Sequence, residues 1–204
     1  MATTGLPDER AVFLNVPFDS SYEPLFIALI ASLVSIGRIP RTVLEISESG
    51  QGRLRRILSQ METCRVSLHD LSRVGQPPRF NMPFELGLAY ALRSYHRPTR
   101  RYLFVLLESV PHRLGRTLSD LAGHDPLIHN GKPIGVIAAV LDSIGSPHDD
   151  PSPEDVYSIW RRLMRVSRTL KARNHTDSVF SRTMFNRLVA AATQLAAEAE
   201  LIPH

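Results

Sequence analysis

Short apolar runs alternate with longer segments of helical periodicity through the first half of the chain. Four runs rich in Val, Ile, Leu and Phe predict buried strands, at residues 11–16, 41–46, 64–68 and 102–107. Three segments with apolar positions at helical spacing lie between them, at residues 22–36, 53–62 and 81–92. Largely apolar strands that alternate with helices are typical of a parallel sheet covered on both faces, so we predict an α/β fold.

The pattern changes after the fourth run. Residues 118–121 and 133–144 favour helices, and a Pro-, Asp- and Ser-rich stretch at 146–153 has the composition of a linker. Two amphipathic helices are expected at 153–172 and 180–201. The sequence therefore predicts an α/β domain over residues 1–145 and a C-terminal helical extension over residues 146–204 that packs on it.

Composition narrows the class of protein. The chain has 204 residues, of which 43% are hydrophobic and 22% charged, which excludes disordered and collagen-like chains. A single cysteine, Cys64, excludes an intramolecular disulfide framework and a thiolate zinc site, and it fits a reducing cytoplasm. The longest apolar stretch, at 25–36, is far shorter than the ~20 residues of a membrane span, so we expect no membrane association.

The charge balance permits an anionic partner without demanding one. The 24 Lys and Arg exceed the 20 Asp and Glu by 4, and a basic run lies at residues 161–173. This run is either a solvated helix face or a contact for an anion, and it lacks the interleaved aromatics of a single-strand-binding surface, so nucleic acid is not expected. The histidines are scattered, and no metal site is predicted.

Open parallel sheets bind ligands beyond the carboxyl ends of their strands. Four loops fall there, at residues 17–22, 47–53, 69–81 and 108–112. Glu85 follows the third of them, near the start of a helix that Asn81 can cap. Its helical neighbours Leu88, Ala89 and Leu92 are apolar, so the carboxyl heads a stripe that should face the sheet. Glu85 is therefore either a functional acid or a partner of the helix macrodipole.

Asp70 is the second candidate acid. It follows the third strand, beside the start of the Glu85 helix, and two carboxyls at one edge can divide the roles of acid and base. The alternative is a turn in which Asp70 bonds its own loop at Ser72.

Further candidates for substrate contact come from the same loops. Aromatic side chains could pack against a base, and Arg53 or Arg73 could hold a phosphate as a fork donor, while Asp19 or Ser20 could instead cap the first helix. The polar group Asp120, Asp125 and His129 either forms a turn or reaches back to the site. The predicted substrate-binding residues are Phe18, Asp19, Ser20, Tyr22, Ser47, Arg53, Ser72, Arg73, Phe80 and Asn81.

Three segments carry a resemblance to a known family. At residues 12–16, 69–72 and 80–87 (the last reading Phe-Asn-Met-Pro-Phe-Glu-Leu-Gly) the chain resembles bacterial TIR-like proteins. The spacing of Glu85, Gly87 and Ala89 is also similar to that of nucleoside 2-deoxyribosyltransferases. The resemblance implies a flavodoxin-like three-layer fold with four to five parallel strands and a cytoplasmic homo-oligomer.

The same resemblance implies an activity. It suggests cleavage of the N-glycosidic bond of NAD or a related nucleotide in bacterial anti-phage defence, with Glu85 supporting or capturing the ribosyl cation and with no cofactor besides NAD as substrate. Asp70 would orient a ribose hydroxyl or water. The alternatives are a nucleotide-signal sensor or oligomerising module without catalysis, a deoxyribosyl transfer enzyme that needs an acceptor base, and an interaction scaffold.

Overall fold

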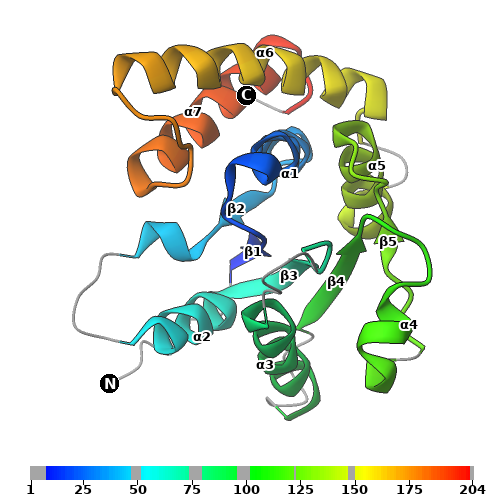
Figure 1. The fold of residues 1–204 in the computed structure, drawn as a ribbon. Coiled ribbons are helices and arrows are strands. Elements are labelled where there is room, and N and C mark those ends of the chain that lie inside the picture. Colours follow the sequence, from blue (N-terminus) through cyan, green and yellow to red (C-terminus); the bar gives the residue numbers. More distant parts are fainter. Residues whose placement is uncertain are drawn as a thin grey trace.

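A five-stranded parallel sheet forms the centre of the molecule. The computed structural model describes residues 8–46, 52–73, 80–95, 102–121, 123–146 and 150–202. The strand order is β2-β1-β3-β4-β5, and every neighbouring pair is parallel (Figure 1). The strands are β1 (Asp8–Asn15), β2 (Ile39–Arg41), β3 (Cys64–Asp70), β4 (Leu103–Glu108) and β5 (Leu127–Ile128).

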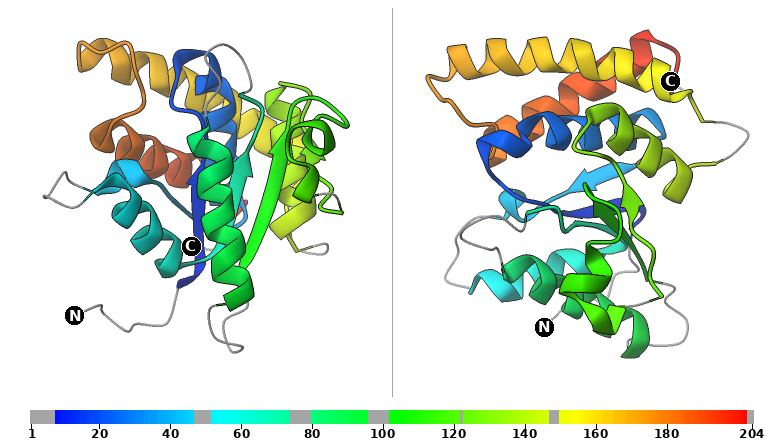
Figure 2. Two further views of the ribbon diagram at one scale, coloured as in Figure 1. Left: turned by 60° about the horizontal axis from the view of Figure 1, so that its bottom comes forward. Right: turned by 45° about the vertical axis from the view of Figure 1, so that its right-hand side comes forward.

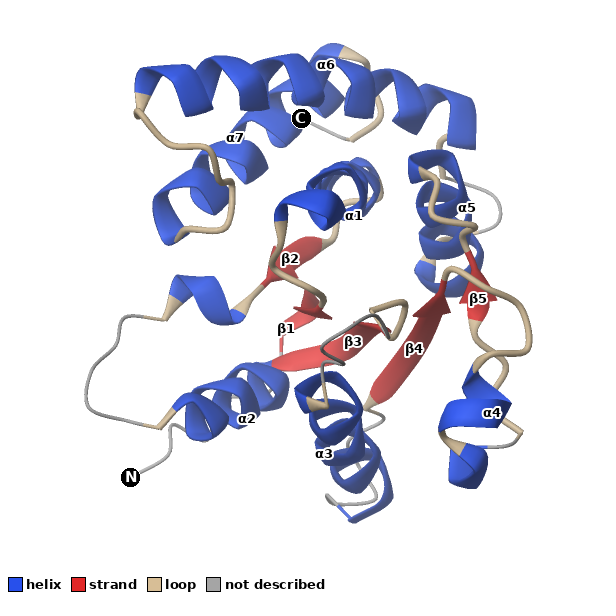
Figure 3. Ribbon diagram, viewed as in Figure 1, coloured by secondary structure: helices blue, strands red, loops and turns tan. Residues whose placement is uncertain are grey.

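Helices cover both faces of this sheet (Figure 3). Alternate residues of β1 point to opposite sides: Val12 and Leu14 enter one core, and Ala11 and Phe13 enter the other. The first core is closed by α1 (Glu23–Ser35) and α5 (Pro133–Ile144), and the second by α2 (Arg53–Thr63), α3 (Asn81–Tyr95) and the short α4 (Leu114–Thr117). The fold is thus a flavodoxin-like three-layer α/β fold, as expected.

Two C-terminal helices add a further layer outside α1. Helices α6 (Pro153–Arg173) and α7 (Arg182–Glu198) lie across α1 on the side away from the sheet (Figure 2). Helix α1 is therefore buried on all sides, and this explains why its sequence is apolar around almost its whole circumference. The residues after 146 share the first hydrophobic core with α1. The division of the chain at residue 145 stays a prediction.

The expected strand at residues 41–46 is wrong. Strand β2 ends at Arg41, and Val43–Glu45 form a 3-10 turn instead. The reason is local: Thr42 Oγ1 accepts the N–H of Leu44, and Glu45 Oε2 accepts the N–H of Thr42 at 2.8 Å. This capping box fixes a turn where β-branched residues had suggested a strand. Pro40 occupies the middle of β2, which the edge position of this strand tolerates.

Most of the remaining elements lie close to their predicted positions. Strands β3 and β4 run on to Asp70 and Glu108, so each of these strands ends on a buried acid. A fifth strand of only two residues, β5, pairs Leu127 with Leu107 and had no separate signal in the sequence. The helix expected at residues 118–121 is wrong: the α-helical turn, α4, comes earlier, and Ser119–Leu121 form a 3-10 turn after it.

Candidate functional site

The strand order reverses between β1 and β3, at the edge where these two strands end. Connections run in opposite directions from these two neighbouring strands, which is the position where doubly wound sheets bind ligands. Tyr22 comes from the segment after β1, and Asp70 ends β3. The predicted loops therefore meet at this edge.

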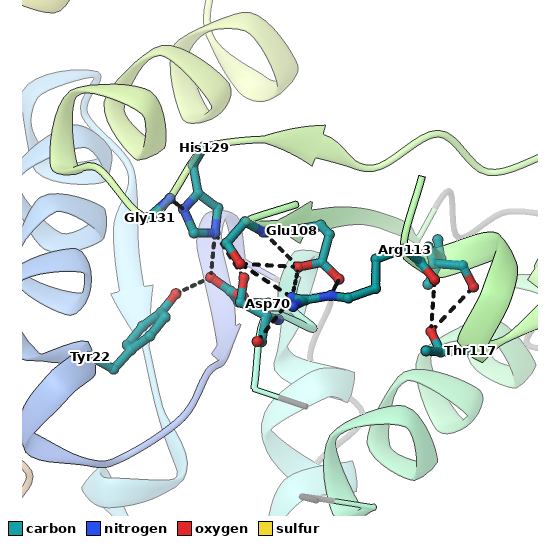
Figure 4. Close-up of polar contacts among 10 residues, drawn as sticks. Tyr22, Asp70, Glu108, Arg113, Thr117, His129 and Gly131 are labelled. Atoms are coloured by element: carbon teal, nitrogen blue, oxygen red, sulfur yellow. Dashed lines mark hydrogen bonds and ion pairs between the residues drawn. The ribbon is translucent and has the colours of Figure 1, made fainter. Parts of the chain in front are cut away.

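Asp70 is the centre of a buried polar cluster (Figure 4). Its Oδ2 accepts the hydroxyl of Tyr22 and lies 3.2 Å from His129 Nε2, while its Oδ1 accepts the N–H of Ser72 at 2.8 Å. Burial raises the pKa of Asp70, but the bonds from His129, Ser72 and Tyr22 and the nearby imidazole outweigh it, so the pKa lies below 3.8. Asp70 is thus held as a carboxylate whose two oxygens are engaged by protein groups.

His129 follows β5 and closes the cluster from the side of α5. Its Nδ1 accepts the N–H of Gly131 at 3.1 Å, so the ring proton is on Nε2. Nε2 faces both Asp70 and the Oγ of Ser72, which is 3.0 Å away. A nucleophilic triad needs the acid and the serine on different ring nitrogens, so these three residues are not one.

The expected turn at Asp70 is present, because the Asp70 carboxylate accepts the backbone N–H of Ser72, two residues further along the chain. The same carboxylate also contacts Tyr22 and His129. In this arrangement Asp70 positions its neighbours. A direct contact of Asp70 with a ribose hydroxyl or water stays a prediction, and it requires one of these bonds to be exchanged.

A charged pair lies next to this cluster, at the rim. Asp19 Oδ2 is 3.3 Å from Arg73 Nε, and the hydroxyl of Ser21 donates to Asp19 Oδ1 at 2.5 Å. Asp19 precedes the 3-10 turn Ser20–Tyr22, but its side chain caps no backbone N–H there. Ser20 is exposed beside it. The guanidinium of Arg73 thus forms an ion pair with the carboxylate of Asp19.

The next strand end carries an ion pair of its own (Figure 4). Glu108 is buried and binds Arg113 through both of its oxygens, with Arg113 Nε 2.9 Å from Oε2. Arg113 also donates to the carbonyl of Ser72 at 2.9 Å. This pair therefore holds the backbone at Ser72, just after β3. Sequence reasoning had reached only the loop that begins at Glu108.

Glu85 lies on the other face of the sheet from Asp70. Leu86 and Ala89 of α3 belong to the core beneath the sheet, whereas Asp70 follows Leu68, which faces the core on the side of α1. Only 6% of the Glu85 side chain is exposed, and its Oε1 is 3.7 Å from a terminal nitrogen of Arg53. The structure therefore does not bring the two predicted acids together as a pair.

The surroundings of Glu85 perturb its titration. Burial raises the pKa of this carboxyl above 4.5, although Arg53 and a hydrogen bond from Asn81 pull the pKa downward. A buried acid with a raised pKa and a guanidinium beside it can act either as a charge or as a proton donor. Glu85 is thus chemically distinct from Asp70.

A cavity of about 330 Å³ lies at the carboxyl ends of β1 and β2, and one of its lining residues is Arg53, the ion-pair partner of Glu85. Its apolar wall is formed by Phe18, Val43, Leu44 and Ile46. The cations that line it are Arg53 and Arg56 of α2 and Arg182 at the start of α7. We call this feature the arginine groove; its volume is at the lower end of the range of small-molecule sites.

The predicted residues thus fall into two groups. One group lies at the ends of β1 and β3: Asp19, Tyr22, Asp70, Ser72 and Arg73. In the other, Phe18 and Arg53 line the arginine groove, and Glu85 and Asn81 are connected to it through Arg53. Phe80 is 76% exposed. Ser47 lies outside the described residues.

Sequence reasoning missed part of this arrangement. It left His129 open between two roles, and the structure shows that His129 reaches back to Asp70, whereas Asp120 and Asp125 are exposed. Arg56 could have been found, because it is one helical turn from Arg53. Arg182 lies more than 120 residues further along the chain, and no local pattern connects it to the groove.

Comparison with known proteins adds no name to this geometry. The chain matches no protein-family model, no curated protein and no solved structure at a significant level. No helix in the described part of the chain is long and apolar enough to span a membrane. Within the same ranges, no group of three or more His, Cys, Asp and Glu side chains is placed to hold a metal ion. The site is therefore interpreted from its own chemistry.

Proposed function

We propose that this protein cleaves the N-glycosidic bond of NAD or a related nucleotide, with Glu85 as the catalytic carboxylate. The observation that carries the proposal is a buried acid, Glu85, 3.7 Å from Arg53, an arginine that also lines a cavity with an aromatic side chain and further cations. Phe18 would contact the base, and Glu85 would face the ribose. The resemblance of residues 80–87 to TIR-like proteins agrees with this assignment of Glu85.

The reaction needs little from the protein besides charge and position. The bond between ribose C1′ and the base nitrogen breaks, and its electron pair leaves on the base. Positive charge then develops on the ribose, and a carboxylate at Glu85 stabilises or captures it. Water adds to C1′ and releases one proton to solvent, which completes a hydrolysis. Addition of another nucleophile at C1′ would instead give cyclisation or transfer.

The test compares wild type and Glu85→Gln with NAD, a panel of nucleotides and deoxynucleosides, at low and high protein concentration. Chromatography with mass detection follows the products. We expect wild type to release nicotinamide or another free base, and Glu85→Gln to do so at least about 100-fold more slowly, because a charged group in contact with the transition state is lost.

Glu154→Gln is the matched control. Glu154 is an exposed acid in the first turn of α6, so it interacts with a helix dipole without facing a cavity. We expect this variant to keep wild-type turnover. Unchanged turnover in a folded Glu85→Gln protein would remove Glu85 from the mechanism.

One observation favours a second candidate, a nucleotide sensor. Both oxygens of Asp70 are occupied by Tyr22, Ser72 and His129, so Asp70 is not free to activate water in this arrangement. Thermal stabilisation by one nucleotide without any product at either protein concentration would select the sensor over the enzyme.

A further inference from the structure

The arginine groove collects positive charge from two distant parts of the chain. Arg53 and Arg56 come from successive turns of α2, and Arg182 begins α7. Within the part of the chain that the structure describes, no carboxylate lines the groove. Like charges that share one cavity repel each other, and an apolar wall strengthens their field. Such a cavity attracts an anion, which would reduce the repulsion between the guanidinium groups.

Nearby acids do not neutralise this charge fully. Glu45 is engaged by the N–H of Thr42 and lies 3.3 Å from Arg41 Nε, outside the lining of the groove. Glu85 is 3.7 Å from Arg53, and the charge of Arg182 acts on Glu45, but Arg56 has no ion pair with a carboxylate among the described residues.

The guanidinium of Arg56 has N–H donors without an acceptor. Its one hydrogen bond within the described chain is long, 3.5 Å, from a terminal nitrogen to the carbonyl of Ile46. Its Nε is buried and has no acceptor among the described residues. A guanidinium presents five N–H donors in a fixed plane, and that arrangement matches two oxygens of a phosphate.

We infer that Arg53, Arg56 and Arg182 form a phosphate-binding subsite, so the substrate is a phosphate-bearing nucleotide and not a nucleoside. Arg53 contacts both the groove and Glu85, so a phosphate held there places the attached ribose next to the carboxyl. The inference rests on the proposed function for the role of the ribose, but binding itself requires no catalysis. It also gives the C-terminal helices a part in the site, through Arg182.

Isothermal titration calorimetry on the full chain tests the subsite. The probes are inorganic pyrophosphate, ADP and adenosine at low ionic strength. We expect pyrophosphate and ADP to bind, and adenosine to bind at least tenfold more weakly than ADP. Binding of ADP should weaken as salt is raised, because the contacts are between charges.

Two variants and a matched control assign the binding to the groove. Arg56→Gln and Arg182→Gln should each weaken ADP binding at least tenfold. Arg55→Gln makes the same change of charge at an exposed position of α2 that does not line the groove, and it should leave ADP binding unchanged. Circular dichroism and the Tm of each variant establish that it is folded.

The outcomes separate this inference from the proposed function. If ADP binds through Arg56 and Arg182 but wild type releases no base, the subsite stands and the catalytic proposal fails. If wild type cleaves nucleosides and adenosine binds as tightly as ADP, catalysis stands and the subsite is overturned. Equal losses in Arg55→Gln and Arg56→Gln, or no loss in either groove variant, would also overturn it.

Discussion

Glu85 and Asp70 are both buried, but their surroundings act on them in opposite directions. Burial dominates at Glu85 and raises its pKa above 4.5, whereas the donors around Asp70 outweigh burial and lower its pKa below 3.8. Asp70 therefore stabilises the fold at all pH values above that of its titration in the unfolded chain, and this contribution is lost as the pH falls through its folded pKa. Glu85 costs stability once it is ionised, and such a cost is typical of functional acids.

The pH dependence of stability tests this contrast at Glu85. The unfolded chain loses the Glu85 proton near pH 4.5, and the folded chain loses it at higher pH. The free energy of unfolding contributed by this group therefore falls as the pH rises through that window. Glu85→Gln removes the fall. We expect the variant to gain stability relative to wild type between pH 4.5 and pH 8, measured by urea unfolding at each pH.

The comparison is a difference between two proteins, so groups that titrate alike in both cancel. A stability difference that stays constant over this pH range, or that turns against the variant as the pH rises, would mean that Glu85 is not strained by its burial. The turnover assay and this measurement together distinguish a functional acid from a helix-dipole partner.

At the scale of single residues, the sequence predicted those features that depend on neighbours within a few positions of the chain. The turn at Asp70 and the position of Glu85 in the early part of α3 follow from spacing within a few residues. The bond between Tyr22 and Asp70 joins residues 48 positions apart, and it depends on the pairing of β1 with β3. Sequence alone places both residues at one edge, but it does not show that the carboxylate faces away from Glu85.

At the scale of elements, continuous apolar strands gave a reliable signal and short edge strands did not. β1, β3 and β4 are largely buried, and each contains enough apolar residues to be predicted as a strand, although Arg65 and Ser67 interrupt the apolar pattern of β3. β2 and β5 are edge strands of three and two residues, too short for a hydrophobic pattern. The capping box from Thr42 to Glu45 decides where β2 ends, and it competes with the β propensity of Val43.

The contact between α1 and α6 gives an element-scale prediction. Lys171 Nζ lies 2.8 and 3.0 Å from the two oxygens of Glu23, and the hydroxyl of Ser167 donates to the same carboxylate at 3.2 Å. Lys171→Ala leaves Glu23 buried with one donor fewer. We expect a loss of about 1–3 kcal/mol in the free energy of unfolding, measured in urea.

Arg165→Ala is the control for that loss. Arg165 is exposed on the same helix, and exposed substitutions of this kind change stability by less than about 0.5 kcal/mol. Equal effects of the two variants would indicate that the Lys171 contact contributes no more than an ordinary surface residue.

At the scale of the whole molecule, the C-terminal helices share the first of the two hydrophobic cores with the α/β layers. Phe26 of α1 packs with Phe185 of α7, and Val156 and Leu163 of α6 belong to the same cluster. The indole N–H of Trp160 donates to the carbonyl of Pro24 at 3.0 Å. The helical extension therefore covers α1 and shields it from solvent. We expect the chain to unfold as a single cooperative unit.

Trp160 offers a direct measurement of that cooperativity, because it is the one tryptophan in the chain. Its fluorescence reports on the contact between α6 and α1, and far-ultraviolet circular dichroism reports on all helices. The two signals should show the same midpoint in urea. A fluorescence midpoint at lower urea than the dichroism midpoint would show that α6 detaches before the α/β layers unfold.

The short edge strands also govern how copies of the chain can meet. β2 spans three residues around Pro40 and β5 spans two, so neither rim of the described sheet presents a long row of free backbone donors and acceptors. These rims offer a second chain only a short template for adding a strand, so we expect them to resist edge-to-edge polymerisation. We expect self-assembly of this protein to use helix surfaces instead, where single side-chain changes abolish it without disturbing the sheet.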